Sequence, residues 1–197
     1  VSRADNDCRW EYDNFEWNLE YRMSTLELKE LSHPSGEVIK IAAGKTLDLK
    51  TQGTTTLPTG STLQVLGHLH TSGSFVATTS TSYIATGLTK TITPSSTSSK
   101  IKIDVSFFVD VDTTGAGVYF TIKRGSTSLG ASTRDAGTGL ALVSNGRLLT
   151  GLSITYLDSP STTSATTYSL HMKAASGTVR YRVDETMCAL ILTEIQG

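Results

Sequence analysis

The sequence of 197 residues lacks the charge imbalance and the long apolar runs that mark several common functions. It carries 17 Lys and Arg against 18 Asp and Glu, so it offers no electrostatic basis for binding nucleic acid or anionic membranes. No apolar run approaches the roughly 18–20 residues of a membrane-spanning helix, and the start shows no charged-then-apolar export signal. The sequence begins at Val1 rather than at a methionine, so we expect a processed chain or a fragment of a longer one.

Cysteine is scarce as well. The two cysteines, Cys8 and Cys188, lie at opposite ends of the sequence. Two cysteines exclude a disulfide framework and a zinc site built from several cysteines. No pattern brings the two together, and Cys188 falls in the apolar run MCALIL, where a buried free thiol is expected.

Charged residues (18%), aromatic residues (7%) and prolines (4) are few, whereas the chain holds 24 serines and 32 threonines. A high content of Ser and Thr can indicate disorder or a stalk. Here the threonines alternate with Val, Ile, Leu, Tyr and Phe at a period of two, and β-branched Thr suits the exposed face of a strand. The composition therefore predicts an all-β protein with a neutral polar surface.

Residues 1–36 form a charged, aromatic-rich segment. Residues 1–50 hold 17 of the 35 charged residues. The run FEWNLEYRM at 15–23 alternates apolar and polar residues, which predicts a one-sided strand. A helix is the alternative, because apolar residues also recur at heptad-like spacing, at Trp10, Trp17, Leu28 and Leu31. His33-Pro34-Ser35-Gly36 breaks either element, and we expect residues 1–36 to be a docking segment.

Residues 37–74 are a series of short apolar-alternating pieces separated by glycine turns. Such short strands, each with one thin apolar face, cannot bury a core within one chain. Three copies wrapped around a threefold axis can cover these faces, whereas a structureless loop of about forty residues would be unusual in a compact chain. The pattern predicts an intertwined trimeric β-stem of the triple β-helix or β-prism type.

Residues 75–197 show a regular antiparallel pattern. Apolar-alternating strands are separated by turns every eight to twelve residues or so, with no helical stretch between them, which predicts a β-sandwich of the jelly-roll type. Asn145-Gly146 is the strongest signal for a two-residue hairpin. The predicted strands are Phe75–Thr79, Tyr83–Ile92, Lys100–Val111, Gly117–Arg124, Ser126–Thr133, Leu140–Ser144, Gly146–Tyr156, Thr166–Ala174, Val179–Val183 and Met187–Ile195.

The sequence carries no recognisable catalytic motif. Nucleophile-elbow, P-loop and dinucleotide-loop spacings are absent from it. Asp110 and Asp112 share a strand face and could form a glycosidase pair, but solvated aspartates are expected at the end of a strand. We therefore predict that the protein is not an enzyme and rank a depolymerase last among its functions.

His68-Leu69-His70 is the sharpest local signal for metal binding. On a strand, residues i and i+2 point to the same side, so both imidazoles face one direction. A threefold stem would bring six imidazoles to its axis, an octahedral set suited to iron or another divalent transition ion that holds the trimer together. The alternative is a pair of solvated or locally hydrogen-bonded histidines.

A long run within the predicted sandwich resembles the C-terminal domain of bacteriophage tail-fibre and related virion fibre proteins, notably those of marine and cyanobacterial phages. The pattern TGL-x-x-x-ITP-x-S-x-SSKI is followed by GAG-x-x-F-x-I-x-R, present here as Thr86-Gly87-Leu88, Ile92-Thr93-Pro94, Ser98-Ser99-Lys100-Ile101, Gly115-Ala116-Gly117, Phe120, Ile122 and Arg124. The upstream region is similar to the repetitive β-stem of such fibres, and its His-x-His pair matches the axial iron-binding motif of some of them. The resemblance covers roughly residues 37–197.

The resemblance implies a homotrimer on the virion, at the tail or the capsid surface, that attaches the virus to a host-surface glycan or protein. Residues 1–36 would then contact other virion proteins. Receptor contacts are expected from exposed loops at one end of the sandwich, Thr113–Gly117, Thr133–Gly139 and Asp158–Thr166. The residues singled out are Thr113, Thr114, Arg134, Asp135, Asp158, Ser159 and Ser161.

The alternative is a structural virion component that binds no receptor. It would be a head fibre that decorates the capsid, or a connector within the tail. The charged N-terminal segment favours this alternative slightly, because it looks like a specific docking surface. Neither function requires a cofactor other than the possible axial metal.

Overall fold

The chain divides into two units, residues 1–54 and 55–197. The computed structural model describes residues 43–44, 57–71, 75–111, 115–130, 136–141, 146–182 (for Arg182 the backbone alone) and 187–197. The predictions for residues 1–36 and for most of the predicted stem therefore lie outside the described residues. Within the described ranges, no helix is long and apolar enough to cross a membrane.

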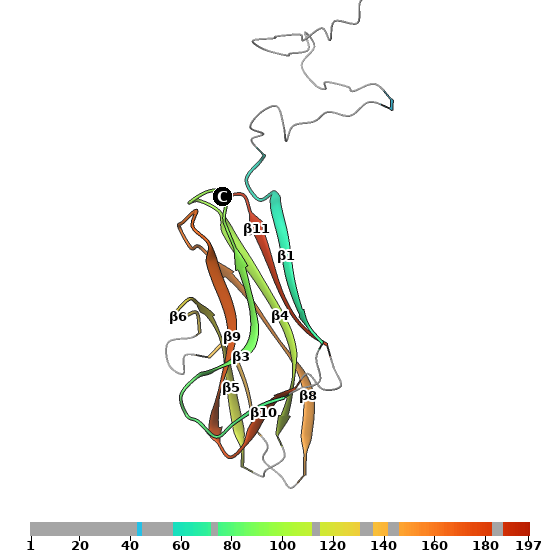
Figure 1. Ribbon diagram of the computed structural model, residues 1–197, viewed down its shortest axis with the longest axis vertical. Coiled ribbons are helices and arrows are strands. Elements are labelled where there is room, and N and C mark those ends of the chain that lie inside the picture. The colour runs from blue at the N-terminus through green and yellow to red at the C-terminus, as the bar shows by residue number, and fades with distance from the viewer. Residues whose placement is uncertain are drawn as a thin grey trace, which may run out of the picture. The chain divides into compact units, whose positions relative to one another are not determined.

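The described residues form eleven strands in two antiparallel sheets (Figure 1). Sheet A contains β1 (Thr62–His70), β2 (Val76–Thr78), β4 (Lys100–Val111), β8 (Leu148–Asp158), β10 (Val179–Arg182) and β11 (Cys188–Ile195). Sheet B contains β3 (Ile84–Ile92), β5 (Gly117–Arg124), β6 (Thr127–Ser128), β7 (Thr138–Ala141) and β9 (Thr166–Ser176). The prediction of an all-β sandwich is confirmed.

Three pairs of strands act as single interrupted strands. β11 and β10 pair with β4 one after the other along its length, β1 and β2 pair with β11 and β10 in turn, and β7 and β6 both pair with β5. When each pair is counted as one strand, the strand order is 1-8-3-6 in sheet A and 2-7-4-5 in sheet B. This is the order of a jelly roll, which consists of two Greek keys wound around each other.

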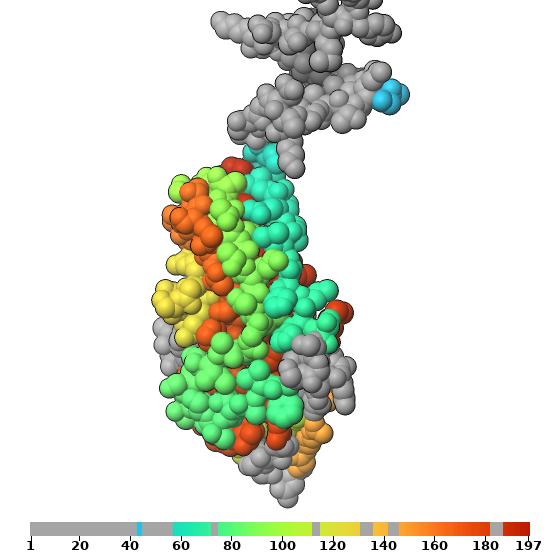
Figure 2. Space-filling model, in the orientation of Figure 1, coloured from blue at the N-terminus to red at the C-terminus, as the bar shows by residue number. Residues whose placement is uncertain are grey.

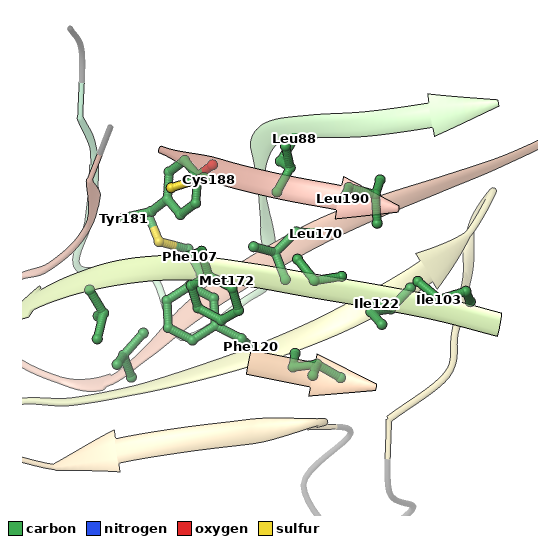
Figure 3. Close-up of a cluster of buried hydrophobic side chains, with 14 of the residues drawn as sticks. Leu88, Ile103, Phe107, Phe120, Ile122, Leu170, Met172, Tyr181, Cys188 and Leu190 are labelled. Atoms are coloured by element: carbon green, nitrogen blue, oxygen red, sulfur yellow. The ribbon is translucent and has the colours of Figure 1, made fainter. Parts of the chain in front are cut away.

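The inward faces of the two sheets build one apolar core (Figure 3). Every second residue of β4 is buried: Ile101, Ile103, Val105, Phe107, Val109 and Val111. Phe107 contacts Phe120 of sheet B, with ring centroids 4.5 Å apart and the rings tilted by 51°, a favoured aromatic geometry. The alternation that predicts β4 from the sequence is therefore the pattern that forms the core.

The sandwich begins earlier than predicted, because β1 lies inside the stretch assigned to the stem. β1 pairs with β11 from Thr62 opposite Ile195 to His70 opposite Cys188, and Leu66 packs against the core. Figure 2 shows β1 (cyan) on the surface directly beside β3 (green). The inward face of β1 is thus covered by its own chain rather than by sister chains, and the predicted boundary at residue 75 is corrected to the start of β1. No separate stem is present among the described residues.

Asn145 of the predicted hairpin at Asn145-Gly146 lies outside the described residues, but the strands on either side of this turn do not pair with each other. β7 pairs with β5 in sheet B, whereas β8 pairs with β4 in sheet A along eleven residue pairs. The connection between β7 and β8 therefore passes from one sheet to the other, because the long ladder with β4 outweighs a local turn preference. Most other predicted strands match within a few residues, but in the described part of Ser126–Thr133, residues 126–130, the strand covers only the two residues of β6.

The loops of the jelly roll lie at two ends. The C-terminal end holds residues 93–99 and 159–165, and there Gly60 N donates to Gln196 O and Gln196 N to Ser61 O, each at 2.8 Å. The opposite end holds the turns at 79–83, 115–116 and 177–178. The 12 residues of β4 separate the two ends by about 37 Å at the usual rise per residue.

Candidate functional site

The predicted receptor loops do not share one end of the sandwich. Asp158–Thr166 follows β8 at the C-terminal end, since Asp158 pairs with Ile101 at the start of β4. The described part of Thr113–Gly117, residues 115–117, leads into β5 at the opposite end, where Gly117 pairs with Ser176. The expectation that these loops form one binding surface at one end of the sandwich is therefore wrong. Four of the predicted contact residues lie outside the described residues: Thr113, Thr114, Arg134 and Asp135.

Asp158 is a structural residue at the end of β8, and its side chain is turned away from solvent. It is only 6% exposed. Arg124 Nη1 donates to both carboxylate oxygens at 2.8 Å, and Tyr168 Oη donates to Oδ2 at 2.6 Å. Burial raises the pKa of Tyr168 strongly and the carboxylate raises it further, so the phenol remains a donor. The buried carboxylate of Asp158 therefore has little surface with which to contact a receptor. Ser159 and Ser161, by contrast, are exposed.

His68 and His70 share one face of β1 as predicted, with stacked rings 5.9 Å apart. That face points into the sandwich, because their register partners Leu190 and Cys188 belong to the core. His68 Nδ1 lies 2.7 Å from Thr89 O of β3. A threefold axis along the outer side of β1 would meet the opposite face, so the predicted arrangement of imidazoles around an axis is not supported here. No group of three or more metal-ligating side chains occurs among the described residues.

Asp110, one half of the proposed carboxylate pair, is held by arginines. Its side chain is buried on the outer side of sheet A, and Arg147 donates to both carboxylate oxygens at 2.8 Å through Nε and Nη2. Arg180 Nη1 lies 3.7 Å from Oδ2. This bidentate geometry is that of a structural ion pair, while Asp112 lies outside the described residues.

Glu194 is a buried carboxylate that accepts four hydrogen bonds. It is 0% exposed, and its oxygens accept from Ser95 N and Oγ (2.7 Å each), Ser99 Oγ (2.7 Å) and Gln64 Nε2 (2.6 Å). Burial alone would raise the pKa of Glu194, but the hydrogen bonds from Ser99, Gln64 and Ser95 outweigh burial and hold the pKa below its ordinary value. The carboxylate thereby ties β1, β11 and the loop at 93–99 together.

The outer face of sheet A carries an apolar strip along β1 and β11. Val65 is 59%, Leu69 57% and Ile191 38% exposed, and the register places them on one face, with Ile191 opposite Gly67 between the other two. Met187, just before β11, is exposed as well. In the described residues β1 has β11 as its one hydrogen-bonded neighbour and is the edge of the sheet. An uncharged apolar edge strand is a template for pairing with another chain.

The outer face of sheet B is different in character and carries a row of aromatic and cationic side chains. Lys173 of β9 and Tyr119 of β5 are register partners, and Tyr83 precedes β3 on the other side of β9. Lys173 Nζ lies 4.5 Å from the centroid of the Tyr83 ring and 5.8 Å from that of Tyr119. Lys123 Nζ lies 5.9 Å from the Tyr83 ring. These distances are those of cation–π contacts.

A shallow depression of about 380 Å³ adjoins this row at the end opposite the C-terminus. Tyr119 forms its wall, and small residues and backbone of β5, β7 and β9 form its floor. A Cβ at Gly117 would lie 3.2 Å from Cβ of Ala175, so the glycine keeps the floor low. Ser176 Oγ donates to Gly115 O at the rim. The lining residues are Gly115, Gly117, Tyr119, Gly139, Leu140, Ala141, Ala175 and Ser176.

His171 lies on the same outer face, opposite Thr121 of β5. Its Nε2 is 3.0 Å from Ser169 Oγ, while its Nδ1 is buried without a hydrogen-bond partner among the described residues. Burial lowers the pKa of His171, and the positive charge of Lys123 lowers it further. The imidazole is therefore neutral at neutral pH, and the positive charge of this face comes from its lysines.

The row and the depression on sheet B escape sequence reasoning. Tyr83, Tyr119 and Lys173 are up to 90 residues apart in the chain, and a single sequence does not reveal which strands are neighbours. One local signal was available, since Tyr119 alternates with the apolar residues Val118 and Phe120 and must face away from the core. Cys188 is buried, as predicted, and Cys8 lies outside the described residues.

The described part of the chain is thus an antiparallel jelly-roll β-sandwich. No family model and no curated protein matches the sequence, so the resemblance to phage fibres stays a prediction. Solved structures similar to the chain include T=1 particles derived from infectious bursal virus (9% identity, TM-score 0.41, 78% of this chain and 41% of that one) and the T=13 particle of the same virus (11% identity, TM-score 0.38, 78% and 40%). The chain thus spans about two fifths of the length of these proteins.

Proposed function

We propose that this protein is a structural, non-enzymatic component of a virion that assembles as a homotrimer through sheet A. The observation that carries the proposal is the apolar strip of Val65, Leu69 and Ile191 beside the open edge of β1. A large apolar surface exposed on a strand edge is costly unless another chain covers it. The phage-fibre resemblance of the sequence supports the assignment to a virion.

A second copy of the chain is the occupant that best fits the strip. Sheet A has further exposed apolar side chains on β8, at its other edge: Leu149 and Leu157. A contact between the strip on one copy and β8 on the next uses two different patches, and such a heterologous contact closes into a ring when the rotation between copies is one third of a turn. A copy related by a twofold axis would leave the β8 patch uncovered.

The buried carboxylates support a non-enzymatic function. Asp110, Asp158 and Glu194 are each held by hydrogen bonds from their own chain. A glycosidase needs two carboxyl groups that face a substrate across a groove. Carboxylates whose oxygens are enclosed by arginine, tyrosine and serine donors serve the fold instead.

Native mass spectrometry of the full chain tests the assembly. We expect the wild type at three times the 21.1 kDa of one chain, because the strip and β8 cover each other. Leu69→Glu places a charge in the contact and should yield monomers, whereas Thr91→Glu, at an exposed strand position of sheet B, should leave the trimer intact. A monomeric wild type, or a trimer that persists in Leu69→Glu, would show that the strip is not the subunit contact.

The assignment to a virion has its own test. Quantitative mass spectrometry of purified particles of the encoding virus should find the chain at a copy number divisible by three. Absence of the chain from particles that are intact and infectious would contradict this part of the proposal while leaving the trimer result untouched.

Attachment to a host surface is the second candidate function. Sheet B carries the cation–aromatic row and the depression described above, and a trimer that joins through sheet A would leave this outer face open to solvent. The predicted contact residues Ser159 and Ser161 are exposed at the C-terminal end, far from the depression. Attachment therefore finds better support at the outer face of sheet B than at the predicted loops.

A further inference from the structure

The charged residues in the strands of sheet B are all positive. Their described residues include Lys90, Lys123, Arg124 and Lys173 but no Asp or Glu. Arg124 is bound to Asp158, and Lys90 is the register partner of the buried Tyr168, so Lys123 and Lys173 carry the positive charge of the outer face. The residues that line the depression are uncharged, but the positive charge of the neighbouring lysines attracts ligands of the opposite sign.

We propose that the depression beside Tyr119 is a binding subsite for an acidic saccharide, a sugar that carries carboxylate or sulfate groups. The inference rests on the proposed attachment function and names its ligand class. Tyr119 offers an aromatic surface at the wall, and aromatic side chains present a large apolar area with a polar tip, which suits the apolar face and the hydroxyl groups of a sugar ring. Lys173, its register partner, lies outside the lining of the depression, but its Nζ is 5.8 Å from the centroid of the Tyr119 ring.

The floor of the depression is built so that a ring can lie close to the backbone. Gly117 and Ala141 are register partners on adjacent strands, and neither has a side chain larger than a methyl group. The volume of about 380 Å³ is at the low end of ligand pockets, so it fits a single sugar unit of a longer polymer. Ser176 Oγ donates its own proton to Gly115 O at the rim, and its oxygen can still accept a hydrogen bond from a sugar hydroxyl group.

The charges favour an acidic sugar over a neutral one. Lys173 and Lys123 lie on the same face as Tyr83, within 6 Å or so of its ring, and their ammonium groups are compact donors that pair with carboxylate or sulfate oxygens. Cation–π contacts hold the lysine side chains in place before a ligand arrives. Each subsite is shallow and its affinity is weak, but three copies per trimer convert weak binding into avidity.

Binding of defined polymers to the immobilised full-length protein tests the inference. Polygalacturonate carries carboxylates, dextran sulfate carries sulfates, and dextran is neutral. We expect the wild type to bind at least one anionic polymer and not dextran, with affinity that falls as salt increases. Binding to polygalacturonate alone identifies a carboxylate ligand, and binding to dextran sulfate alone identifies a sulfate ligand. Equal binding of dextran, or no binding of either anionic polymer, would overturn the inference.

Three variants locate the binding. Lys173→Gln removes the ammonium group, and Ala141→Gln fills the depression without changing charge, so each should weaken binding about tenfold. Lys100→Gln removes the same charge from an exposed position of sheet A and should bind like the wild type. Equal losses in Lys173→Gln and Lys100→Gln would indicate unspecific charge attraction and refute the subsite. Native masses measured on the same samples show whether the trimer persists, so a failed subsite is distinguished from a failed assembly.

Discussion

Tyr119 and Gly139 are register partners on adjacent strands, and the tyrosine ring covers the glycine. A Cβ at residue 139 would lie 2.6 Å from Cδ1 and 2.9 Å from Cε1 of the ring. Glycine in a strand is ordinarily unfavourable, because it has no side chain to pack and more backbone freedom to lose. An aromatic ring across the pair restores the missing contact, and here it also fixes the wall of the depression.

Gly139→Ala should therefore destabilise the fold, because the new methyl group must displace the ring or the strand. We expect a loss of about 1–3 kcal/mol in the free energy of unfolding, measured by urea denaturation. Gly151→Ala is the matched control, since a Cβ there meets Phe108 at an ordinary distance of 3.6 Å. Equal effects of the two substitutions would show that the tyrosine ring does not constrain residue 139.

Glu194→Gln should destabilise the C-terminal end of the sandwich. Its carboxylate accepts hydrogen bonds on both oxygens, from serine donors on Oε1 and from Gln64 on Oε2. The NH2 group of a glutamine at position 194 would face one of these donors without an acceptor. If the Gln64 amide flipped to accept from it, Gln64 would lose its hydrogen bond to Thr93 O. We expect a loss of about 2 kcal/mol at neutral pH, measured by thermal or urea unfolding.

The same carboxylate makes stability depend on pH. The pKa of Glu194 is lower in the folded chain than its ordinary value of 4.5, so its contribution is fully present above that value and is lost as the pH falls through the folded pKa. The stability difference between wild type and Glu194→Gln should thus shrink in acid. Asp104→Asn, at a half-exposed surface ion pair with Lys102, is the control and should change stability by less than about 1 kcal/mol. A difference that stays constant with pH would argue against an ionised, strongly bonded Glu194.

Asp158→Asn separates a structural role from a role in attachment. The substitution removes the charge that Arg124 and Tyr168 bind, so we expect a loss of about 2 kcal/mol in unfolding free energy. Ser159→Ala, at the neighbouring exposed position, should leave stability unchanged. If Asp158→Asn retained full stability while host-cell adsorption was lost, the residue would be a receptor contact after all.

The alternation of the sequence predicts most of the sandwich, and long-range pairing accounts for most errors. β4 and β5 are evident from every second residue being apolar, as in Ile101 to Val111. β1 shows the same alternation, but a short apolar strand does not reveal which surface covers it. Its partner β11 begins at Cys188, more than a hundred residues away, so the sequence alone favoured sister chains over the strand that actually pairs with it.

The candidate site was harder to predict than the fold, for the same reason. The pair His68 and His70 is obvious in the sequence, yet its meaning depends on which side of β1 faces the core. The row of Tyr83, Lys173 and Tyr119 is invisible in the sequence, because it forms only when β3, β9 and β5 lie side by side. Local patterns thus predict strands and their faces, and the pairing of strands decides what those faces bring together.

Removal of metal should leave the protein unchanged. His68 and His70 point toward the core side of β1, where His68 Nδ1 meets Thr89 O at 2.7 Å and His70 Nδ1 lies 3.5 Å from Tyr181 Oη. Treatment with a chelator should therefore alter neither the melting temperature nor the native mass, and His68→Asn should keep the wild-type mass because the outer face of β1 makes the subunit contact. One iron or zinc ion per trimer, lost together with the trimer on chelation, would restore the axial site predicted from the sequence and would require β1 to turn its histidines outward.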